Sequence, residues 1–409
     1  MTPSVSVLPS ETASQTKPAS TEDVSSPTFT YSAMPNLTSA IEKAGNDFRS
    51  DVSTAPTAAM MQAILEASVA DDIYDEHGDP SVNALQDRLL ELTGKEAALW
   101  ALSGTMGNQI CLRTHLVQPP HAVLLDHRAH VHCWESGALP VLSQATVNTI
   151  IPANGVHLTV DEVRKNMVGG DNLHFPPTRV VSLENTLSGT ILPLKDAKEI
   201  SAFVRSYPVP AGQKPVAMHL DGARLFDGIA GEEGADLKEY CACFDSISIC
   251  LAKGLGAPMG SVILGNRAFI ERAKWFRKMF GGGTRQPGMM ASAALTALNN
   301  SIPQFPRVHA LTKSTAAKLA SFGYSFQLPV QTNMILIDLE AAGIPPAAFV
   351  RYCSEVGLQV FPSGRLVFHY QTTTGAAERL VGALERLMED KKGGRELEGG
   401  EVRGGYFKG

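Results

Sequence analysis

Lys253 is the residue of this sequence best placed for covalent chemistry, because it follows an apolar, β-branched run and precedes glycines. The segment from 244 to 256 reads FDSISICLAKGLG. A lysine amine that a buried strand delivers to a glycine-rich turn can bond to the carbonyl group of a cofactor. The pattern therefore predicts a nucleophilic amine at the end of a strand.

Acidic residues end two earlier apolar runs in the same way. The run at 179–183 is followed by Glu184, and the run at 216–220 is followed by Asp221. In an open α/β sheet, ligands bind beyond the carboxyl ends of the strands. We therefore expect these side chains to meet Lys253 in one crevice.

Asp221 has two interpretations that the sequence leaves open. An aspartate after a strand commonly caps the next helix. The alternative is a buried carboxylate that faces a cationic ring nitrogen, with Arg224 one helical turn further along.

The turn Ser103-Gly104-Thr105 is open to two interpretations as well. Its small, hydroxyl-bearing residues precede a predicted helix and could cap it through side-chain oxygens. The same turn could present backbone N–H groups to a phosphate.

Three histidines fall within the stretch DHRAHVH at 126–132. No second histidine or carboxylate completes a zinc spacing there, so no metal site is expected. We interpret the stretch as a strand or loop, which sends neighbouring side chains to opposite faces. A solvent-exposed histidine cluster is the simplest interpretation, and one histidine, His130, facing a flat cofactor ring is the functional one.

Helix-like and strand-like segments alternate along the chain, which predicts an α/β fold with a mostly parallel sheet. Amphipathic helices are expected at 58–70 and 82–92, and a short strand at 96–102. At 409 residues and 44% hydrophobic content, the chain can form a large domain and a smaller one.

Composition limits the partners of this protein. The net charge of −6 gives no basic field for a phosphate backbone, so nucleic acid is not an expected partner. No apolar run reaches about 18 residues, so no membrane span is expected. The six cysteines are scattered without a CxxC pair, which is typical of a reducing compartment such as the cytoplasm.

The two ends differ from the rest in composition. Residues 1–45 are rich in Ser, Thr, Pro and Ala and are expected to form a disordered leader, without the features of a signal peptide. Residues 389–409 are charged and glycine-rich and are expected to form a flexible tail. Between them we expect a large cofactor-binding domain at 46–305 and a small C-terminal domain at 306–388.

Ten segments in a fixed order carry a resemblance to a known family. They are FRSDVSTAPT at 48–57, DDIYDEHGDPSVNALQ at 71–86, GKEAALWALSGTMGNQI at 94–110, RAHVHCWESGALPVLSQA at 128–145, SLENTLSGTILPL at 182–194, HLDGARLFDG at 219–228, DSISICLAKGLGAPMGSVILGN at 245–266, FRKMFGGGTRQPGMM at 276–290, TNMILIDL at 332–339 and GRLVFHYQTTT at 364–374. The chain resembles the fold-type-I pyridoxal-phosphate enzymes of the threonine aldolase and β-eliminating lyase family, most closely the fungal low-specificity L-threonine aldolases.

The resemblance implies roles toward pyridoxal 5'-phosphate. Lys253 would bond to the aldehyde of this cofactor, and Asp221 would pair with its ring nitrogen. Ser103, Gly104 and Thr105 would hold the phosphate at a helix N-terminus, with Arg224 also near the cofactor. His130 would stack on the ring and serve as an acid or base.

Further residues would bind the substrate, a small amino acid. The resemblance implies that Arg365 grips its carboxylate with Ser50 and Arg224 nearby. The family builds its site between subunits, so a homo-oligomer, dimer or tetramer, with a shared active site is implied. Tyr74 and Arg285 would then reach the site of a neighbouring chain.

The implied reaction is cleavage of the Cα–Cβ bond of L-threonine, L-allo-threonine or a related β-hydroxy-α-amino acid, which gives glycine and an aldehyde. An alanine racemase of fungal specialised metabolism is the alternative, because the same scaffold supports it. This chain departs from the family pattern at Ala252 and Pro287, where serine is common. It has Leu187 where bacterial members often have a histidine.

Overall fold

The computed structural model describes residues 35–170 and 172–397. Its centre is a seven-stranded sheet in the order β1-β7-β6-β5-β4-β2-β3. The strands are β1 (Ala97–Ala101), β2 (Ala122–Asp126), β3 (Thr146–Ile150), β4 (Thr178–Glu184), β5 (Ala217–Asp221), β6 (Ser246–Cys250) and β7 (Ser261–Gly265). All neighbouring pairs are parallel except those of β7 with β1 and β6. The expected α/β class with a mostly parallel sheet is confirmed.

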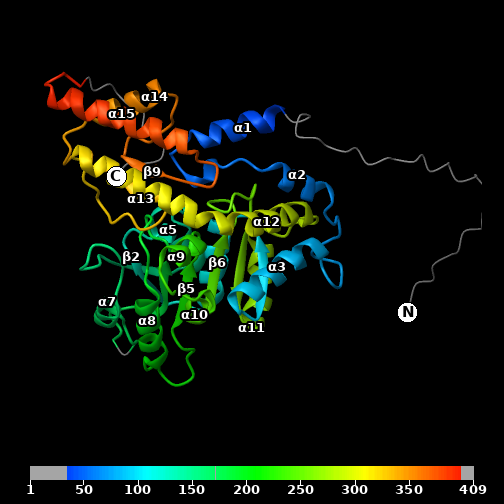
Figure 1. Cartoon of the computed structure of the whole chain (residues 1–409). Coiled ribbons are helices and arrows are strands. Elements are labelled where there is room, and N and C mark those ends of the chain that lie inside the picture. Colours follow the sequence, from blue (N-terminus) through cyan, green and yellow to red (C-terminus); the bar gives the residue numbers. More distant parts are fainter. Residues whose placement is uncertain (1–34, 171, 398–409) are drawn as a thin grey trace, which may run out of the picture.

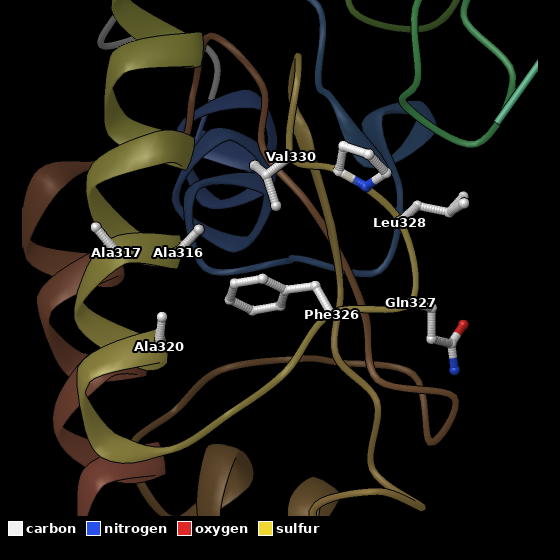
Figure 2. A pocket seen from close by; sticks show the side chains of 8 residues that line it. Ala316, Ala317, Ala320, Phe326, Gln327, Leu328 and Val330 are labelled. Carbon is white, nitrogen blue, oxygen red and sulfur yellow. The ribbon is translucent and has the colours of Figure 1, made fainter. Parts of the chain in front are cut away.

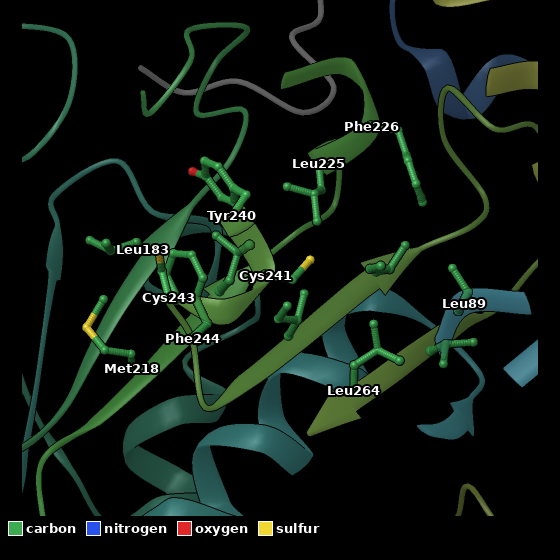
Figure 3. Close-up of a cluster of buried hydrophobic side chains, with 14 of the residues drawn as sticks. Leu89, Leu183, Met218, Leu225, Phe226, Tyr240, Cys241, Cys243, Phe244 and Leu264 are labelled. Atoms are coloured by element: carbon green, nitrogen blue, oxygen red, sulfur yellow. The ribbon is translucent and has the colours of Figure 1, made fainter. Parts of the chain in front are cut away.

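Both faces of this sheet are covered. Consecutive side chains of a strand point to opposite faces, and here they pack in different hydrophobic clusters. Trp100 packs in the largest cluster and its neighbour Leu99 in a smaller one. Leu124 and Leu125 divide in the same way. Figure 3 shows part of the largest cluster, formed by side chains that include Phe244. Strands buried on both faces read as continuous apolar runs, as this sequence does.

Helices connect the strands and cover the sheet (Figure 1). They are α2 (Ala58–Leu65), α3 (Pro80–Thr93), α4 (Gly104–His115), α5 (His130–Cys133), α6 (Ala138–Ser143), α7 (Val160–Asn166), α8 (Leu194–Ser206), α9 (Leu225–Gly231), α10 (Leu237–Ala242), α11 (Arg267–Met279) and α12 (Gly288–Ser301), with short 3₁₀ turns η2 (Asp51–Ser53) and η3 (Ile302–Gln304). Local sequence sets their ends. Asp79 caps α3 through two backbone N–H groups, Pro80 fills its first position, and Gly94 ends it in the left-handed conformation.

A second hydrophobic core lies on one side of the sheet, at the top of Figure 1. It combines the two-stranded sheet of β8 (Met334–Leu336) and β9 (Arg365–Val367) with α13 (Phe305–Phe322), α14 (Pro346–Glu355) and α15 (Thr374–Lys392). Phe48 packs into the same core from near the other end of the chain. The N-terminal segment therefore links this second core to the main sheet.

Expected and observed elements agree closely in the centre and less well at the edges. The helix expected at 82–92 is α3, and the strand expected at 96–102 is β1, whereas the helix expected at 58–70 ends at Leu65. The strand or loop expected at 126–132 is wrong in its second half. There β2 ends at Asp126 and α5 begins at His130.

The expected leader and tail each need one correction. Residues Pro35–Gly45 form α1, whose Ala44 is buried, so the leader is not disordered over these residues. The last helix, α15, runs to Lys392, so the expected tail is helical at its start. The remaining parts of both segments, 1–34 and 398–409, lie outside the described residues.

A pocket of about 440 Å³ lies between α13 and the segment that leads to β8. Figure 2 shows Phe326 and Val330 facing Ala316 and Ala320 of α13. None of its lining residues is ionisable. The ionisable residues expected to do chemistry lie instead at the carboxyl ends of the strands. In the described part of the chain, no helix is both long and apolar enough to cross a membrane.

Candidate active site

Lys253 lies three residues after β6 ends, where the buried strand opens into the glycine turn expected from the sequence. Its side chain is half-buried, and the N–H of Gly256 donates to its carbonyl at 2.8 Å. The ammonium group is close enough to act on three acidic or basic neighbours, because its charge alters the pKa values of Asp51, His130 and Glu184. The structure thus brings Lys253 together with residues from three other segments.

Asp221 ends β5 and is buried, with 3% of its surface exposed. Its Oδ2 accepts a hydrogen bond from Asn108 Nδ2 at 2.7 Å, and its Oδ1 accepts one from the backbone N–H of Ala223 at 3.0 Å. The second bond closes a local turn two residues long and does not cap the next helix, because α9 begins at Leu225 with Arg224 as its N-cap residue and no side-chain cap. The capping interpretation of Asp221 is therefore wrong, and its carboxylate belongs to the buried site.

His130 begins α5 beside two carboxylates. Its Nδ1 lies 2.8 Å from Glu135 Oε1, and its backbone N–H donates to Glu184 Oε2 at 2.8 Å. Burial lowers the pKa of His130, but the hydrogen bond to Glu135 and the charge of Asp221 outweigh it, so that the pKa is raised overall. An imidazole with a raised pKa is a stronger base when neutral.

Glu184 ends β4 and is paired with Asp221 in the register of the sheet. Burial, followed by the negative charge of Asp221, raises the pKa of Glu184 to about 7, while His130 and Lys253 oppose the shift. This carboxyl group therefore changes its protonation near neutral pH. A titratable group with such a pKa, set in a cluster of charges, marks a functional site.

A buried ion pair joins the N-terminal segment to the turn after β5. Arg224 contacts Asp51 through two hydrogen bonds of 2.6 and 2.7 Å, and both side chains are buried. Burial opposes the charge of Asp51, but Arg224 more than compensates and holds the pKa of Asp51 well below its usual range. The pair fixes the guanidinium of Arg224 in one orientation.

Arg365 comes from β9 of the second core and approaches this pair. Burial, and then repulsion by Arg224, lower the pKa of Arg365 to about 10, while Asp51 opposes the shift. Ser50 is adjacent, with its Oγ 3.5 Å from Asp51 Oδ1. Two guanidinium groups with one carboxylate between them leave a net positive charge, which suits a carboxylate ligand. The two cores of the molecule supply this charge together.

The Ser103-Gly104-Thr105 turn opens α4 as expected. Ser103 Oγ accepts a hydrogen bond from the N–H of Met106 at 3.2 Å, so the capping interpretation is confirmed. Ser103 and Thr105 are nevertheless exposed. Capping uses one of the N–H groups at the helix start, and the positive end of the helix remains open to an anion.

Pyridoxal 5'-phosphate, the cofactor that the sequence implies, offers an aldehyde, a ring nitrogen, a flat ring and a phosphate. The site has an amine in Lys253, a buried carboxylate in Asp221, an imidazole in His130 and the exposed start of α4. The donor set therefore fits the cofactor that the sequence implies.

Tyr74 and Arg285 lie together, but apart from this cluster. The backbone N–H of Tyr74 and the guanidinium of Arg285 both approach the carboxylate of Asp71. Their side chains are 82% and 75% exposed. Among the described residues, no recorded contact joins either of them to Lys253 or Asp221. Their expected role in a neighbouring site stays a prediction.

The sequence analysis assigned Glu184 no role beyond its place at a strand end, and it did not single out Asp51, Asn108 or Glu135. Glu184 gave a usable signal, because it ends a buried strand in the same way as Asp221. The other three act through hydrogen bonds between segments far apart in the chain, such as the 113 positions between Asn108 and Asp221. A sequence pattern does not show such pairings.

Three side chains of the candidate active site also form a group of possible metal ligands. The ligand atoms of His130, Glu135 and Asp221 lie within 4.8 Å of one another. Hydrogen bonds from Asn108 and His130 account for this closeness.

Comparison with known proteins places these observations in a family. The family model of the β-eliminating lyases matches residues 47–342. A protein of Schizosaccharomyces pombe, named a probable low-specificity L-threonine aldolase, is 42% identical over 344 residues, which are 84% of this chain and 88% of that protein. A protein of Cochliobolus carbonum, named an alanine racemase, is 33% identical over 351 residues, which are 84% of this chain and 87% of that protein.

The fold is also that of a solved threonine aldolase, from Leishmania major. The two structures superpose with a TM-score of 0.69 at 20% sequence identity, and the match covers 84% of this chain and 99% of the other. At this identity the similarity concerns the fold alone. The family resemblance and the fold expected from the sequence are thus both confirmed.

Proposed function

This chain belongs to the β-eliminating lyase family, and from that premise we propose that it is a pyridoxal-phosphate-dependent aldolase. Its substrate is L-threonine, L-allo-threonine or a related β-hydroxy-α-amino acid, and its products are glycine and an aldehyde. The observation that carries the proposal is the gathering of Lys253, Asp221 and His130 beside the Arg224–Asp51 pair. The name of the S. pombe relative supports the choice of reaction.

Each part of the site has a role toward the cofactor. Lys253 would bond covalently to its aldehyde, and Asp221 would pair with its ring nitrogen. Ser103, Gly104 and Thr105 would hold its phosphate at the start of α4. When bound, pyridoxal 5'-phosphate supplies an electron sink for the bond that breaks at the Cα atom of the amino acid.

Arg365 binds the carboxylate of the amino acid, assisted by Arg224 and Ser50. A planar guanidinium can hold a carboxylate through two parallel hydrogen bonds, which fixes the orientation of the substrate as well as its position. Because Asp51 already holds Arg224 through two bonds, Arg224 is positioned before the substrate arrives. This arrangement reduces the entropy cost of orienting the substrate.

His130 is the residue proposed to take the proton from the β-hydroxyl group. Loss of this proton lets the C–O bond become the carbonyl of the departing aldehyde as the Cα–Cβ bond breaks, and a proton returned to Cα completes glycine. The raised pKa of His130 favours the first step. The pKa of Glu184, near 7, places a second proton donor or acceptor in the same cluster.

Alanine racemisation is the alternative, and the Cochliobolus carbonum relative is the observation that favours it. The two reactions are separated by incubating the purified chain with L-threonine, L-allo-threonine and L-alanine in separate samples. Acetaldehyde and glycine from either of the first two support the aldolase. Formation of D-alanine without any acetaldehyde would instead establish the racemase.

We also propose that the chain works as a homo-oligomer, dimer or tetramer, in the cytoplasm. Exposed apolar side chains near Tyr74, among them Leu65 and Val69, support a contact between copies of the chain. The free cysteines of the described residues support a reducing compartment. Sedimentation analysis of wild type and Tyr74→Ala tests the proposed oligomer. If Tyr74→Ala weakens the assembly, activity should fall with it, because the shared site would be lost.

A further inference from the structure

Glu135 is a carboxylate that the reaction outlined above does not use, although it is buried within the site. Its side chain is 0% exposed. Oε1 accepts a hydrogen bond from Asn108 Nδ2 at 3.0 Å and lies 2.8 Å from His130 Nδ1. Oε2 accepts one from Gln109 Nε2 at 2.6 Å. A buried charge with this many partners is retained only where its surroundings are organised around it.

The contact with Glu135 determines which nitrogen of His130 carries a proton. A carboxylate can only accept, so the Nδ1 atom of His130 must donate to it. The Nε2 atom is then the nitrogen available to exchange a proton with a substrate. The backbone N–H of His130, bound to Glu184, fixes the start of α5 and with it the position of the ring.

Asn108 extends this arrangement to Asp221. Its Nδ2 donates to Asp221 Oδ2 at 2.7 Å as well as to Glu135, while its Oδ1 lies 3.3 Å from His219 Nε2. The two carboxylates can only accept, so the amide of Asn108 has one orientation, with Nδ2 toward them and Oδ1 toward His219. Burial lowers the pKa of His219 to about 4, and the Nε2 atom of this neutral ring must be the one that donates to Asn108 Oδ1.

We propose that Glu135 is a positioning residue, which orients the ring of His130 and, through the Asn108 amide, ties it to Asp221. The inference rests on the proposed function for its purpose, because His130 and Asp221 are the two residues assigned to the face and the ring nitrogen of the cofactor. A single carboxylate thus sets the orientation of both. The analogous partners of metal-binding histidines orient their rings in the same way.

The charges that face His130 set the direction in which its pKa should change when Glu135 is replaced. They are the carboxylates of Glu135, Asp221 and Glu184 and the ammonium group of Lys253. Replacement Glu135→Gln preserves the shape but removes the nearest negative charge and leaves only a neutral amide oxygen as acceptor. The burial of His130 is then less opposed, and its pKa should fall.

The test measures the hydrogen–deuterium exchange rate at the Cε1 carbon of each histidine by mass spectrometry across pH, which reports the pKa of each imidazole. It is applied to the full chain with its cofactor bound, without substrate, and we expect Glu135→Gln to lower the pKa of His130. In a separate kinetic assay with substrate, Glu135→Gln should move the acidic limb of the kcat profile to lower pH and reduce kcat more than it changes KM. An unaltered exchange profile of His130 would overturn the proposal.

The control is Asp196→Asn. Asp196 lies 2.8 Å from His157 Nε2, the same distance as in the Glu135–His130 contact, but it is not one of the charges that mainly set the pKa of His130. The substitution Asp196→Asn should leave the pKa of His130 and the visible absorption of the bound cofactor unchanged. A change in His130 equal to that of Glu135→Gln would show a general loss of structure and contradict the proposal.

If Glu135→Gln does not fold, Asn108→Ala carries the test. It leaves the Glu135–His130 contact in place and removes the link to Asp221, so cofactor affinity should fall about tenfold while the pKa of His130 stays raised. Unchanged cofactor affinity in this variant would contradict the link. The exchange is measured without substrate, so its result does not depend on the reaction. If the protein shows these pKa shifts but releases no aldehyde, the proposed function is refuted and the positioning role of Glu135 stands.

Discussion

The carboxylates of this site differ in what they do, although they share one crevice. Asp221 accepts two hydrogen bonds, Asp51 is paired with Arg224, and Glu184 has its pKa raised to about 7. Different partners explain these differences, because a nearby cation favours the ionised form and a nearby anion disfavours it. Residue type alone therefore does not assign a role.

Arg365 should determine substrate affinity through the shape of its guanidinium group. Replacement Arg365→Lys keeps the charge but loses the paired hydrogen bonds to a carboxylate. We expect KM for the amino acid to rise about tenfold or more, with a smaller change in kcat. The control is Arg379→Lys, an exposed arginine of α15, which should leave both constants unchanged. Equal effects of the two substitutions would contradict the role of Arg365.

Glu184 should make stability depend on pH. Its pKa of about 7 in the folded chain lies above the ordinary value of 4.5, so the folded state binds the proton more tightly than the unfolded state does. The stability from this group is fully present below about pH 4.5 and is lost as the pH rises through 7. In cofactor-free protein, Glu184→Gln should therefore raise the melting temperature at pH 8, relative to its effect at pH 5, by about 2–5 °C. Equal changes of the melting temperature at pH 5 and pH 8 would argue against this role of Glu184.

Several of these residues could be predicted from the sequence, and others could not. Lys253 and Asp221 each end an apolar run, and that is a local signal. Glu135 and Asn108 carry no such signal, because their importance comes from meeting each other across 27 positions of the chain. Hydrogen bonds of this kind depend on tertiary structure.

At the scale of elements, the close approach of α4 to the sheet positions the site. Gly107 has no side chain at the point where α4 crosses β6, and a Cβ atom there would lie 2.3 Å from Ser248 Oγ. The start of α4, with Ser103, and the amide of Asn108 are both held by this contact. The sequence predicted the helix and the strands but not the distance between them.

Replacement Gly107→Ala should test this packing. The added methyl group would push α4 away from β6, and we expect about 1–3 kcal/mol loss in the free energy of unfolding, with weaker cofactor binding. The matched control is Gly382→Ala in α15, where a Cβ meets nothing within 4 Å. That change should be neutral or stabilise by up to about 1 kcal/mol. Urea unfolding measures both, and equal stability of the two variants would refute the packing argument.

The local errors of the sequence analysis occurred where tertiary contacts decide the outcome. The stretch at 126–132 was expected to be a strand or loop, yet α5 forms at His130, where Glu184 binds its first N–H group. Likewise α1 forms in a segment with a disordered composition, because Ala44 is buried in the folded molecule. In both places packing and hydrogen bonding outweigh local propensity.

At the scale of the whole molecule, two hydrophobic cores complete one site. Phe305 belongs to the core under the sheet and Val308 to the second core, which supports the proposed domain boundary near residue 305. The second core contributes Arg365, and Phe48 anchors the segment that carries Asp51. The sequence predicted two domains, whereas the return of the N-terminal segment to the second core is a long-range contact that it does not reveal.

The Asp51–Arg224 pair should stabilise the molecule as well as the site. Removing one partner of a buried ion pair leaves the other charge uncompensated, so Asp51→Asn should lower the free energy of unfolding by about 3–5 kcal/mol. Because the pKa of Asp51 is held well below 3.8, this stability is present above about pH 4 and is lost at lower pH.

An exposed pair provides the comparison for this prediction. Asp161 and Arg164 lie 2.7 Å apart, with side chains 84% and 56% exposed. Their separation is close to the 2.6 Å of the buried pair, but Asp161→Asn should change stability by less than about 1 kcal/mol. If chemical unfolding at pH 7 gave similar losses for both substitutions, the Asp51–Arg224 pair would not have the stabilising role assigned to it.

The central claim is that Lys253 is the residue that holds the cofactor. The most direct measurement is treatment of the full chain with pyridoxal 5'-phosphate and sodium borohydride, which makes a lysine–cofactor bond permanent, followed by peptide mass spectrometry. The expected result is one modified peptide containing Lys253, with no modification of the site and no aldehyde release in Lys253→Ala. Stoichiometric labelling of a different lysine, with Lys253 unmodified, would contradict the account.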